Sequence, residues 1–238
     1  MKPMMPAPRP ALRVGLALGS GAARGWSHIG VIRTLEHAGV SPDIVCGTSI
    51  GALVGAAYAA GELNRLETWV KSLTWQGVVG LLDLKFGGGL ISGAKLFDFF
   101  RSQFPDPGIA QLPKTYAAVA TELATGREIW LRDGPVMDAV RASIALPGLF
   151  TPAQQDGRLL VDGALVNPVP VSLCRALGAD IVIAVDLNWD LMGGRRRTAV
   201  ESDAAADETP GALAALLAKL PLGRGKNAQK TELELPSM

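Results

Sequence analysis

Residues 43–60, DIVCGTSIGALVGAAYAA, contain the turn from which the fold and the chemistry of this chain are inferred. The apolar residues of Asp43–Cys46 predict a short buried strand, and the small residues of Ile50–Ala60 predict a closely packed helix. Between them, Gly47-Thr48-Ser49-Ile50-Gly51 matches G-x-S-x-G, the pattern that presents a serine hydroxyl on a sharp strand-to-helix turn. Glycines relieve the crowding in such a turn, and the helix points its first N–H groups at the same place. Ser49 is therefore the candidate nucleophile.

The five-residue pattern alone is not specific, because a tight turn can carry a serine that takes part in no chemistry. The strand-to-helix context favours a nucleophile, which then needs a proton acceptor. The two histidines, His28 and His37, both precede Ser49, whereas the histidine of an α/β-hydrolase triad comes last in the chain. This order excludes the ordinary triad. We interpret both histidines as structural, and a carboxylate is the simplest candidate for the base.

A glycine-rich segment, Gly19-Ser20-Gly21-Ala22-Ala23-Arg24-Gly25, follows a strand predicted over Leu12–Leu18. One interpretation is a dinucleotide-binding turn, but Arg24 stands where a third small residue belongs, and no acid ends the next strand. The chain also lacks the G-K-[ST] of a phosphate-binding loop. The other interpretation is an oxyanion hole, because such turns leave backbone N–H groups free to converge on a developing negative charge. Adjacent parallel strands would bring this loop beside Ser49, and Arg24 would hold the loop or attract an anionic head group.

An acid that can serve as the base occurs in Leu160-Val161-Asp162-Gly163-Ala164. An Asp-Gly pair is usually a surface turn, but here an apolar strand leads directly into it, which predicts a buried carboxylate. Burial raises the pKa of a carboxyl group and makes it a better base near neutral pH. The rival acids Glu122, Asp133 and Asp138 lie near turns or on polar faces. Asp162 is therefore the predicted partner of Ser49.

The alternation of short apolar strands, glycine turns and helices predicts a parallel sheet with helices on its faces. Residues 11–188 form the predicted α/β domain, preceded by a loose arm over 1–10 and followed by a mobile tail over 189–238 with a short helix over 212–220. The segment 63–105 is rich in aromatic residues, which form either core helices or a cap over a site; core helices are favoured. Further elements are predicted as helices over Trp26–His37, Val136–Ser143 and Pro170–Leu177, and as strands over Tyr116–Glu122, Glu128–Arg132, Leu159–Val161 and Asp180–Leu187.

Composition restricts the class of protein. The 238 residues are 48% hydrophobic and 19% charged with a net charge of +1, which indicates a globular chain and gives no support for nucleic acid as a partner. Cys46 and Cys174 lie in apolar runs and are predicted to be buried free thiols, as in a reducing compartment. No segment has the length of a signal peptide or of a spanning helix, so we expect a cytoplasmic protein, soluble or peripheral at the inner membrane surface. No cluster has metal-ligand spacing, so no metal is expected.

Together these motifs resemble the patatin-like phospholipase family, in particular its bacterial branch related to neuropathy target esterase. The segment 142–152, ASIALPGLFTP, is also similar to a family signature, and the resemblance extends over Arg13–Leu187 in the family's order. The resemblance implies a three-layer α/β/α sandwich with a mainly parallel central sheet. It also implies a Ser49–Asp162 dyad, an oxyanion hole from the glycine loop, no metal or cofactor, and phospholipid or lysophospholipid substrates.

The sequence departs from the family pattern at several positions. Ser20 and Ala22 stand where many members have glycine, so Ala22 is either outside the left-handed region or strained. Ala164 replaces the second glycine after Asp162. Residues 233–238 are similar to the start of a further helical portion, which suggests a shortened chain.

The expected function is a serine lipid acyl hydrolase, that is, a phospholipase A, lysophospholipase or esterase acting through an acyl-enzyme. Two alternatives remain at this point. An acyltransferase or a thioesterase shares the acyl-enzyme step and differs in the acceptor or the ester. A non-enzymatic lipid-binding or regulatory module would keep the fold without needing both Ser49 and Asp162. The sequence does not indicate an oligomeric state.

Overall fold

Two adjacent parallel strands carry the two glycine-containing turns. The computed structural model describes residues 12–74, 93–104 and 106–189. Strand β1 (Val14–Leu18) pairs in parallel with β2 (Ile44–Thr48), and Leu18 lies opposite Gly47. Both strands are almost wholly buried, because parallel strands covered on both faces need apolar residues at nearly every position. The chain leaves both strands at the same edge of the sheet, which brings the glycine loop beside Ser49.

The described residues form a seven-stranded mixed sheet with the order β5-β6-β3-β2-β1-β7, and β4 pairs with β3 outside this path. Strands β7, β1, β2 and β3 are mutually parallel, whereas β4, β5 and β6 run antiparallel to their neighbours. The remaining strands are β3 (Thr115–Glu122), β4 (Glu128–Leu131), β5 (Ala153–Gln155), β6 (Arg158–Asp162) and β7 (Ile181–Val185).

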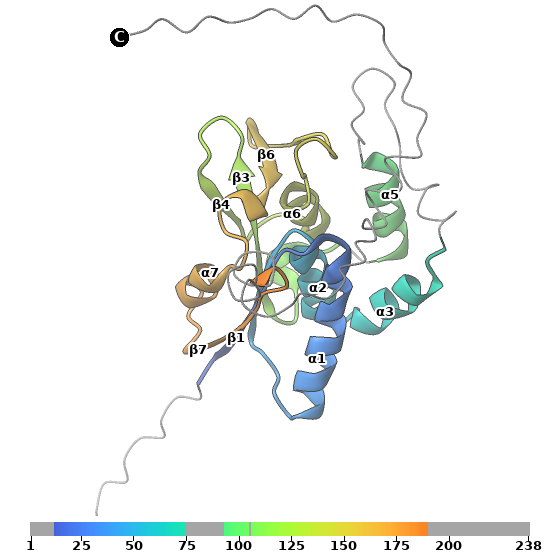
Figure 1. Cartoon of the computed structure of the whole chain (residues 1–238), viewed down its shortest axis with the longest axis vertical. Helices are drawn as coiled ribbons and strands as arrows, with labels where there is room; N and C mark the ends of the chain where they lie inside the picture. Colours follow the sequence, from blue (N-terminus) through green and yellow to red (C-terminus); the bar gives the residue numbers. More distant parts are fainter. Residues whose placement is uncertain (1–11, 75–92, 105, 190–238) are drawn as a thin grey trace, which may run out of the picture. The chain divides into compact units, whose positions relative to one another are not determined.

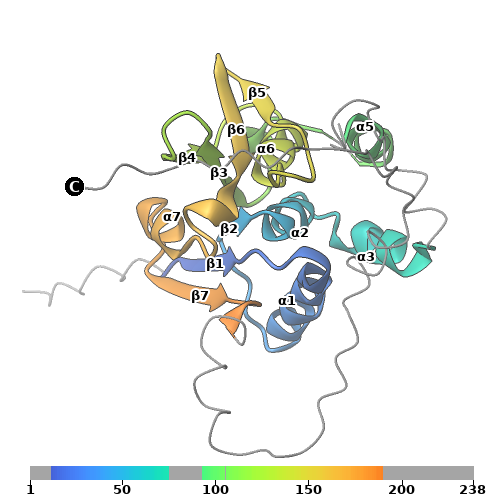
Figure 2. The same cartoon turned by 45° about the horizontal axis from the view of Figure 1, so that its top comes forward.

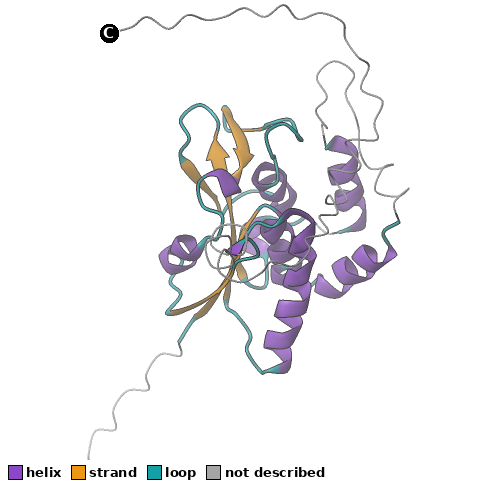
Figure 3. Ribbon diagram, in the orientation of Figure 1, coloured by secondary structure: helices purple, strands orange, loops and turns teal. Residues whose placement is uncertain are grey.

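Helices cover the sheet on both faces, as the three-layer α/β/α prediction requires (Figures 1 and 3). Alternate residues of a strand point to opposite faces, and the core divides accordingly. Leu16, Leu18 and Val45 pack in one cluster, whereas Ala17 and Cys46 pack in the other. The first cluster includes residues of α1 (Ser27–His37), α2 (Ile50–Ala59), α3 (Leu63–Ser72), α5 (Ala94–Gln103) and α6 (Val136–Ser143), and the second includes α7 (Val171–Ala176).

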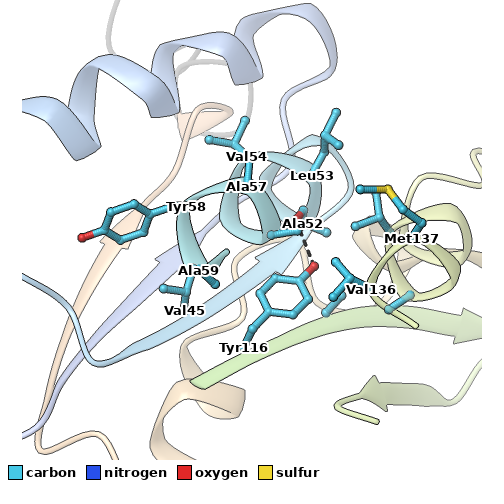
Figure 4. Packing of buried hydrophobic residues seen from close by; sticks show 14 of the residues in the cluster. Val45, Ala52, Leu53, Val54, Ala57, Tyr58, Ala59, Tyr116, Val136 and Met137 are labelled. Atoms are coloured by element: carbon cyan, nitrogen blue, oxygen red, sulfur yellow. Dashed lines mark hydrogen bonds between the residues drawn. The ribbon is translucent and has the colours of Figure 1, made fainter. Parts of the chain in front are cut away.

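Helix α2 lies at the centre of the larger cluster, and most of its residues are buried. Figure 4 shows the hydroxyl of Tyr116, on β3, donating a hydrogen bond of 2.9 Å to the carbonyl of Ala52. A buried phenol needs such a partner, since an unpaired buried hydroxyl is costly. This bond fixes α2, and with it the turn that carries Ser49, against the centre of the sheet.

Aromatic residues from separate helices form one cluster beside α2. Trp69 on α3 lies 5.0 Å from Phe100 on α5 between ring centroids, and 6.2 Å from Trp26. Phe97 and Phe100 are each 2% exposed. The favoured prediction of core helices is therefore confirmed for these residues. Trp75, Phe86 and the glycines 87–89 of the same segment lie outside the described residues.

The predicted elements agree with the structure except at several boundaries. β2 begins at Ile44, one residue after the predicted Asp43, and runs to Thr48, so it reaches the nucleophile directly. β5 was missed, and three short 3₁₀ helices, η1 (Ala22–Trp26), η2 (Ile109–Gln111) and η3 (Gly163–Leu165), were not predicted. Both cysteines are buried free thiols. The predicted arm over 1–10 and the tail beyond residue 189, with its helix over 212–220, lie outside the described residues (Figure 2).

Candidate active site

Ser49 lies between β2 and α2 with φ 57° and ψ −124°. A positive φ is unusual for a residue with a side chain, and such strain is concentrated at functional sites. The neighbouring glycines permit it through close packing. A Cβ on Gly47 would lie 2.3 Å from the carbonyl oxygen of Gly51, and a Cβ on Gly51 would lie 2.2 Å from that of Leu18. The turn predicted from G-x-S-x-G is thus present, and it needs both glycines.

The hydroxyl of Ser49 donates a hydrogen bond of 2.6 Å to Oδ2 of Asp162. Asp162 is the last residue of β6, which pairs with β3 so that Asp162 lies opposite Ala120. A Cβ on Gly163 would lie 2.2 Å from the carbonyl oxygen of Val119, so only glycine lets the chain turn away there. The structure therefore brings together two predicted residues that are 113 positions apart in the sequence.

Asp162 is 2% exposed. Burial raises its pKa, while hydrogen bonds from the Ser49 hydroxyl and the Ala164 N–H act in the opposite direction. The N–H of Ala164 donates to Oδ1 at 2.8 Å, which leaves Oδ2 for Ser49. A carboxyl group with a raised pKa and one oxygen directed at a serine hydroxyl can accept that hydroxyl's proton.

The glycine loop lies beside Ser49, but only part of it can serve as an oxyanion hole. The N–H groups of Gly19, Ser20 and Arg24 donate to the carbonyls of Val185, Pro168 and Gly21, at 3.0, 2.9 and 3.0 Å. These three N–H groups of the predicted hole are therefore already occupied. For the N–H groups of Gly21, Ala22 and Ala23, at the start of η1, no acceptor is found in the described part of the chain. Ala22 has φ 47°, so the strained alternative for this residue is the one observed.

Neither histidine is directed at the serine. The Nε2 atom of His28 lies 2.8 Å from the carbonyl oxygen of Gly19, and the ring is fully buried. A carbonyl only accepts, so Nε2 carries the proton. Burial lowers the pKa of His28, which favours the neutral ring. His37 bonds the carbonyl of Arg33 in its own helix. The structural interpretation of both residues agrees with these contacts.

Two polar residues at the site were missed by sequence reasoning. The Oγ of Ser143, which is fully buried at the end of α6, accepts a hydrogen bond of 2.9 Å from the N–H of Ser49. The side chain of Asn188 contacts both ends of the glycine loop, at Ser20 and Arg24. Ser143 belongs to the segment 142–152, which is similar to a family signature. That similarity indicated that the segment matters, but it did not indicate that Ser143 bonds the N–H of Ser49. No local pattern pointed to Asn188.

A cavity of about 420 Å³ opens onto Ser49. Its polar part consists of Ser49, Asp162, the glycine loop and Asn188. Its apolar wall is formed by Trp26, Ile50, Ile144, Leu146, Leu149 and Phe150. A cavity with one apolar wall and a few converging polar groups suits a ligand that has an apolar chain joined to a polar group.

No group of three or more His, Cys, Asp and Glu residues within 12–74, 93–104 and 106–189 is arranged to hold a metal ion. In the same ranges, no helix is both long enough and apolar enough to cross a membrane.

These features describe a mixed α/β protein whose candidate nucleophile, Ser49, stands on a strand-to-helix turn of a mainly parallel sheet. The model of the family described as patatin-like phospholipase matches residues 16–175. The chain therefore belongs to the patatin-like phospholipase family.

Relatives occur in bacteria and animals. The chain is 44% identical over 185 residues to an uncharacterized NTE family protein of Mycobacterium tuberculosis, covering 77% of this chain and 51% of the relative. It is 37% identical over 182 residues to human patatin-like phospholipase domain-containing protein 6, covering 73% of this chain and 13% of that protein. The chain thus spans about half the length of the mycobacterial relative. Among solved structures, VipD from Legionella pneumophila matches with a TM-score of 0.48 at 15% identity, covering 64% of this chain and 45% of VipD.

Proposed function

We propose that the chain is a serine lipid acyl hydrolase in which Asp162 activates Ser49. The observation that carries this proposal is the 2.6 Å hydrogen bond from the strained Ser49 to the buried Asp162, at the end of a cavity with an apolar wall. Family membership supports lipid ester hydrolysis as the general activity. The substrates proposed are phospholipids or lysophospholipids, whose acyl chain would lie along the apolar wall.

The reaction follows from the positions of these groups. Asp162 takes the proton of the Ser49 hydroxyl while Oγ attacks the ester carbonyl carbon. The resulting oxyanion accepts hydrogen bonds from the free N–H groups of Gly21, Ala22 and Ala23. Collapse of this intermediate breaks the ester C–O bond, the leaving alcohol takes the proton from Asp162, and the acyl group stays on Ser49. Water then attacks the acyl-enzyme with Asp162 again as base, which releases the fatty acid and restores the serine.

Arg24 is exposed at the mouth of the cavity, and its Nη2 donates to Asn188 at 2.7 Å. Among the described residues, no carboxylate forms an ion pair with Arg24. The side-chain contact that Arg24 makes there is to the neutral amide of Asn188. This contact supports a role in holding the loop. The remaining guanidinium donors are available to a phosphate head group at the mouth, which is the second role considered for Arg24.

Contact with a lipid surface is proposed through the rim of the cavity rather than through the aromatic cluster. Residues 145–150, ALPGLF, contain no polar side chain, and Leu146 is 41% exposed. An exposed apolar loop beside a cavity is a feature of surfaces that meet lipid or another apolar partner. The rim would touch a membrane only peripherally.

This proposal is tested by steady-state kinetics of the unmodified protein and of the variants Asp162→Asn and Ser49→Ala. The substrates are a lysophospholipid, a phospholipid, an acyl thioester and a short nitrophenyl ester. Loss of the base should lower kcat for the esters by about two or more orders of magnitude in a protein that remains folded. Preference for the thioester or for an alcohol acceptor would favour a thioesterase or an acyltransferase. Lipid binding without turnover in the unmodified protein would favour a binding module. Near-normal rates in Asp162→Asn, with loss of activity in a folded His28→Ala variant, would require a histidine-based mechanism.

A further inference from the structure

The end of β7 and the residues that follow it support the glycine loop. The carbonyl of Val185 accepts the N–H of Gly19 at 3.0 Å. Leu187 packs beneath Gly21, where an added Cβ would lie 2.9 Å from Cδ1 of the leucine. Asn188 then reaches the loop with its side chain. These residues are more than 160 positions from the loop in the sequence, yet they pack against it and bond to it in the fold.

The amide of Asn188 joins the two ends of the loop. Its Nδ2 lies 3.1 Å from the carbonyl oxygen of Ser20 and 3.2 Å from Oγ of the same residue. Its Oδ1 accepts a hydrogen bond of 2.7 Å from Nη2 of Arg24. The orientation of the amide follows from its partners, since a carbonyl can only accept and a guanidinium can only donate. The N–H of Asn188 itself donates to Oδ1 of Asp186 at 2.8 Å, which fixes the backbone that carries the amide.

The three residues between these two fixed ends are those with free N–H groups. Gly21, Ala22 and Ala23 line the cavity, and Ala22 has the strained φ of 47°. Ala22 and Ala23 are exposed, so packing does little to hold them. A strained and exposed segment keeps one conformation only if its ends are fixed.

We propose that Asn188 is a positioning residue that fixes the oxyanion-binding N–H groups of residues 21–23 by joining Ser20 to Arg24. The inference rests on the proposed function and goes beyond it, because the side chain of Asn188 bonds the glycine loop and acts on the reaction only through that loop. Donors to an oxyanion act in the transition state and contribute little to binding of the substrate. Loss of the amide should therefore lower kcat and leave KM nearly unchanged.

Three variants test this inference. Asn188→Ala removes both contacts. Asn188→Asp has the same shape and keeps an oxygen that accepts from Arg24. It replaces the Nδ2 group, which donates to Ser20, by an oxygen that repels the Ser20 carbonyl. This variant tests the inference even if the alanine variant does not fold. Asn64→Ala is the matched control, because Asn64 also accepts from an arginine, Arg33, through Oδ1 at a site on α3.

The measurement is kcat per active site on a soluble nitrophenyl ester, with sites counted by fluorophosphonate titration. The affinity for a trifluoromethyl ketone, which forms a tetrahedral oxyanion on the serine, is measured beside it. For Asn188→Ala and Asn188→Asp we expect kcat per site to fall about 10- to 100-fold, ketone affinity to fall by a similar factor, and KM to stay within about twofold. Asn64→Ala should match the unmodified protein in all three.

The outcomes separate the inference from the proposed function. Unchanged kcat per site and unchanged ketone affinity in both Asn188 variants would overturn the inference. A smaller titratable fraction with normal kcat per site would also overturn it, since that result describes a purely structural residue. If the unmodified protein neither reacts with the fluorophosphonate nor turns over the ester, the proposed function itself fails.

Discussion

The strained backbone at Ser49 is held by tight packing around single atoms. Ser49 has φ 57°, its N–H donates to Ser143, and its hydroxyl donates to Asp162. The strain of such a residue costs on the order of 1–3 kcal/mol and persists only where its surroundings determine it. At this site the surroundings are the contacts of Gly47 and Gly51, which leave no space for a side chain.

Replacement of Gly51 by alanine tests this packing directly. The new Cβ would lie 2.2 Å from the carbonyl oxygen of Leu18 and 2.6 Å from that of Gly19, so the end of β1 would have to move. Overpacking of this kind costs about 1–3 kcal/mol, and we expect at least that loss in the free energy of unfolding measured with urea. Gly30→Ala is the matched control, since Gly30 also lies in a helix but has no atom within 4 Å of an added Cβ. The control should gain about 0.5–1 kcal/mol.

Asp162 should reduce stability while it serves the reaction. Its pKa is raised by burial, so between the ordinary value of 3.8 and the raised value the folded state binds more protons than the unfolded state. The free energy of unfolding therefore falls as pH rises through that window. Asp162→Asn keeps an acceptor for the Ala164 N–H and removes the buried charge. We expect this variant to be as stable as the unmodified protein at pH near ~4 and more stable at pH near ~7.

The check is urea unfolding of both proteins at several pH values. Two results would contradict the claim that the buried charge of Asp162 lowers stability. One is an Asp162→Asn variant that is less stable than the unmodified protein at neutral pH. The other is a difference in the free energy of unfolding between the two proteins that does not grow with pH.

Much of this site was predictable from the sequence because its signals are local. The serine turn, the glycine loop and the acid at the end of β6 each occupy a few consecutive residues. The parts that could not be predicted depend on contacts between distant segments. Which loop N–H groups stay free is decided by the carbonyls of Val185 and Pro168, and the partners of Ser49 and Ser20 include residues 94 and 168 positions away.

At the scale of elements, the prediction succeeded where a strand is long and apolar and failed where it is short and polar. β1, β2, β3 and β7 are apolar runs of the parallel sheet, whereas β5 consists of Ala153-Gln154-Gln155 and has no pattern to detect. β5 is held in a strand conformation by its pairing with β6, so its own residues carry little of the information that specifies it.

The aromatic cluster supplies the test at this scale. Phe100 is 2% exposed and lies among Trp69, Phe97, Phe99 and Phe104. Phe100→Ala should therefore lower the free energy of unfolding by about 3–5 kcal/mol, the usual cost of removing a buried phenyl ring. A cap that contacts lipid would behave differently: the variant would keep its stability in urea and lose activity on vesicles.

For the whole molecule, the arrangement of the cavity predicts how activity depends on the state of the substrate. If the apolar rim over residues 145–150 meets a lipid surface, turnover of a lysophospholipid should rise as the substrate passes from monomers to micelles. Pro147→Asp, which places a charge on this exposed rim, should reduce that rise. A flat rate across the transition would show that the rim does not contact lipid.

Ser49 is proposed as the nucleophile, with a reactivity that depends on Asp162. The most direct measurement is labelling of the folded protein with a fluorophosphonate, followed by mapping of the modified peptide, in the unmodified protein and in Asp162→Asn and Ser49→Ala. We expect a single label on Ser49, labelling that is about a hundredfold slower in Asp162→Asn, and none in Ser49→Ala. A label on another serine, no label on folded protein, or an undiminished rate in Asp162→Asn would contradict the roles proposed for these two residues.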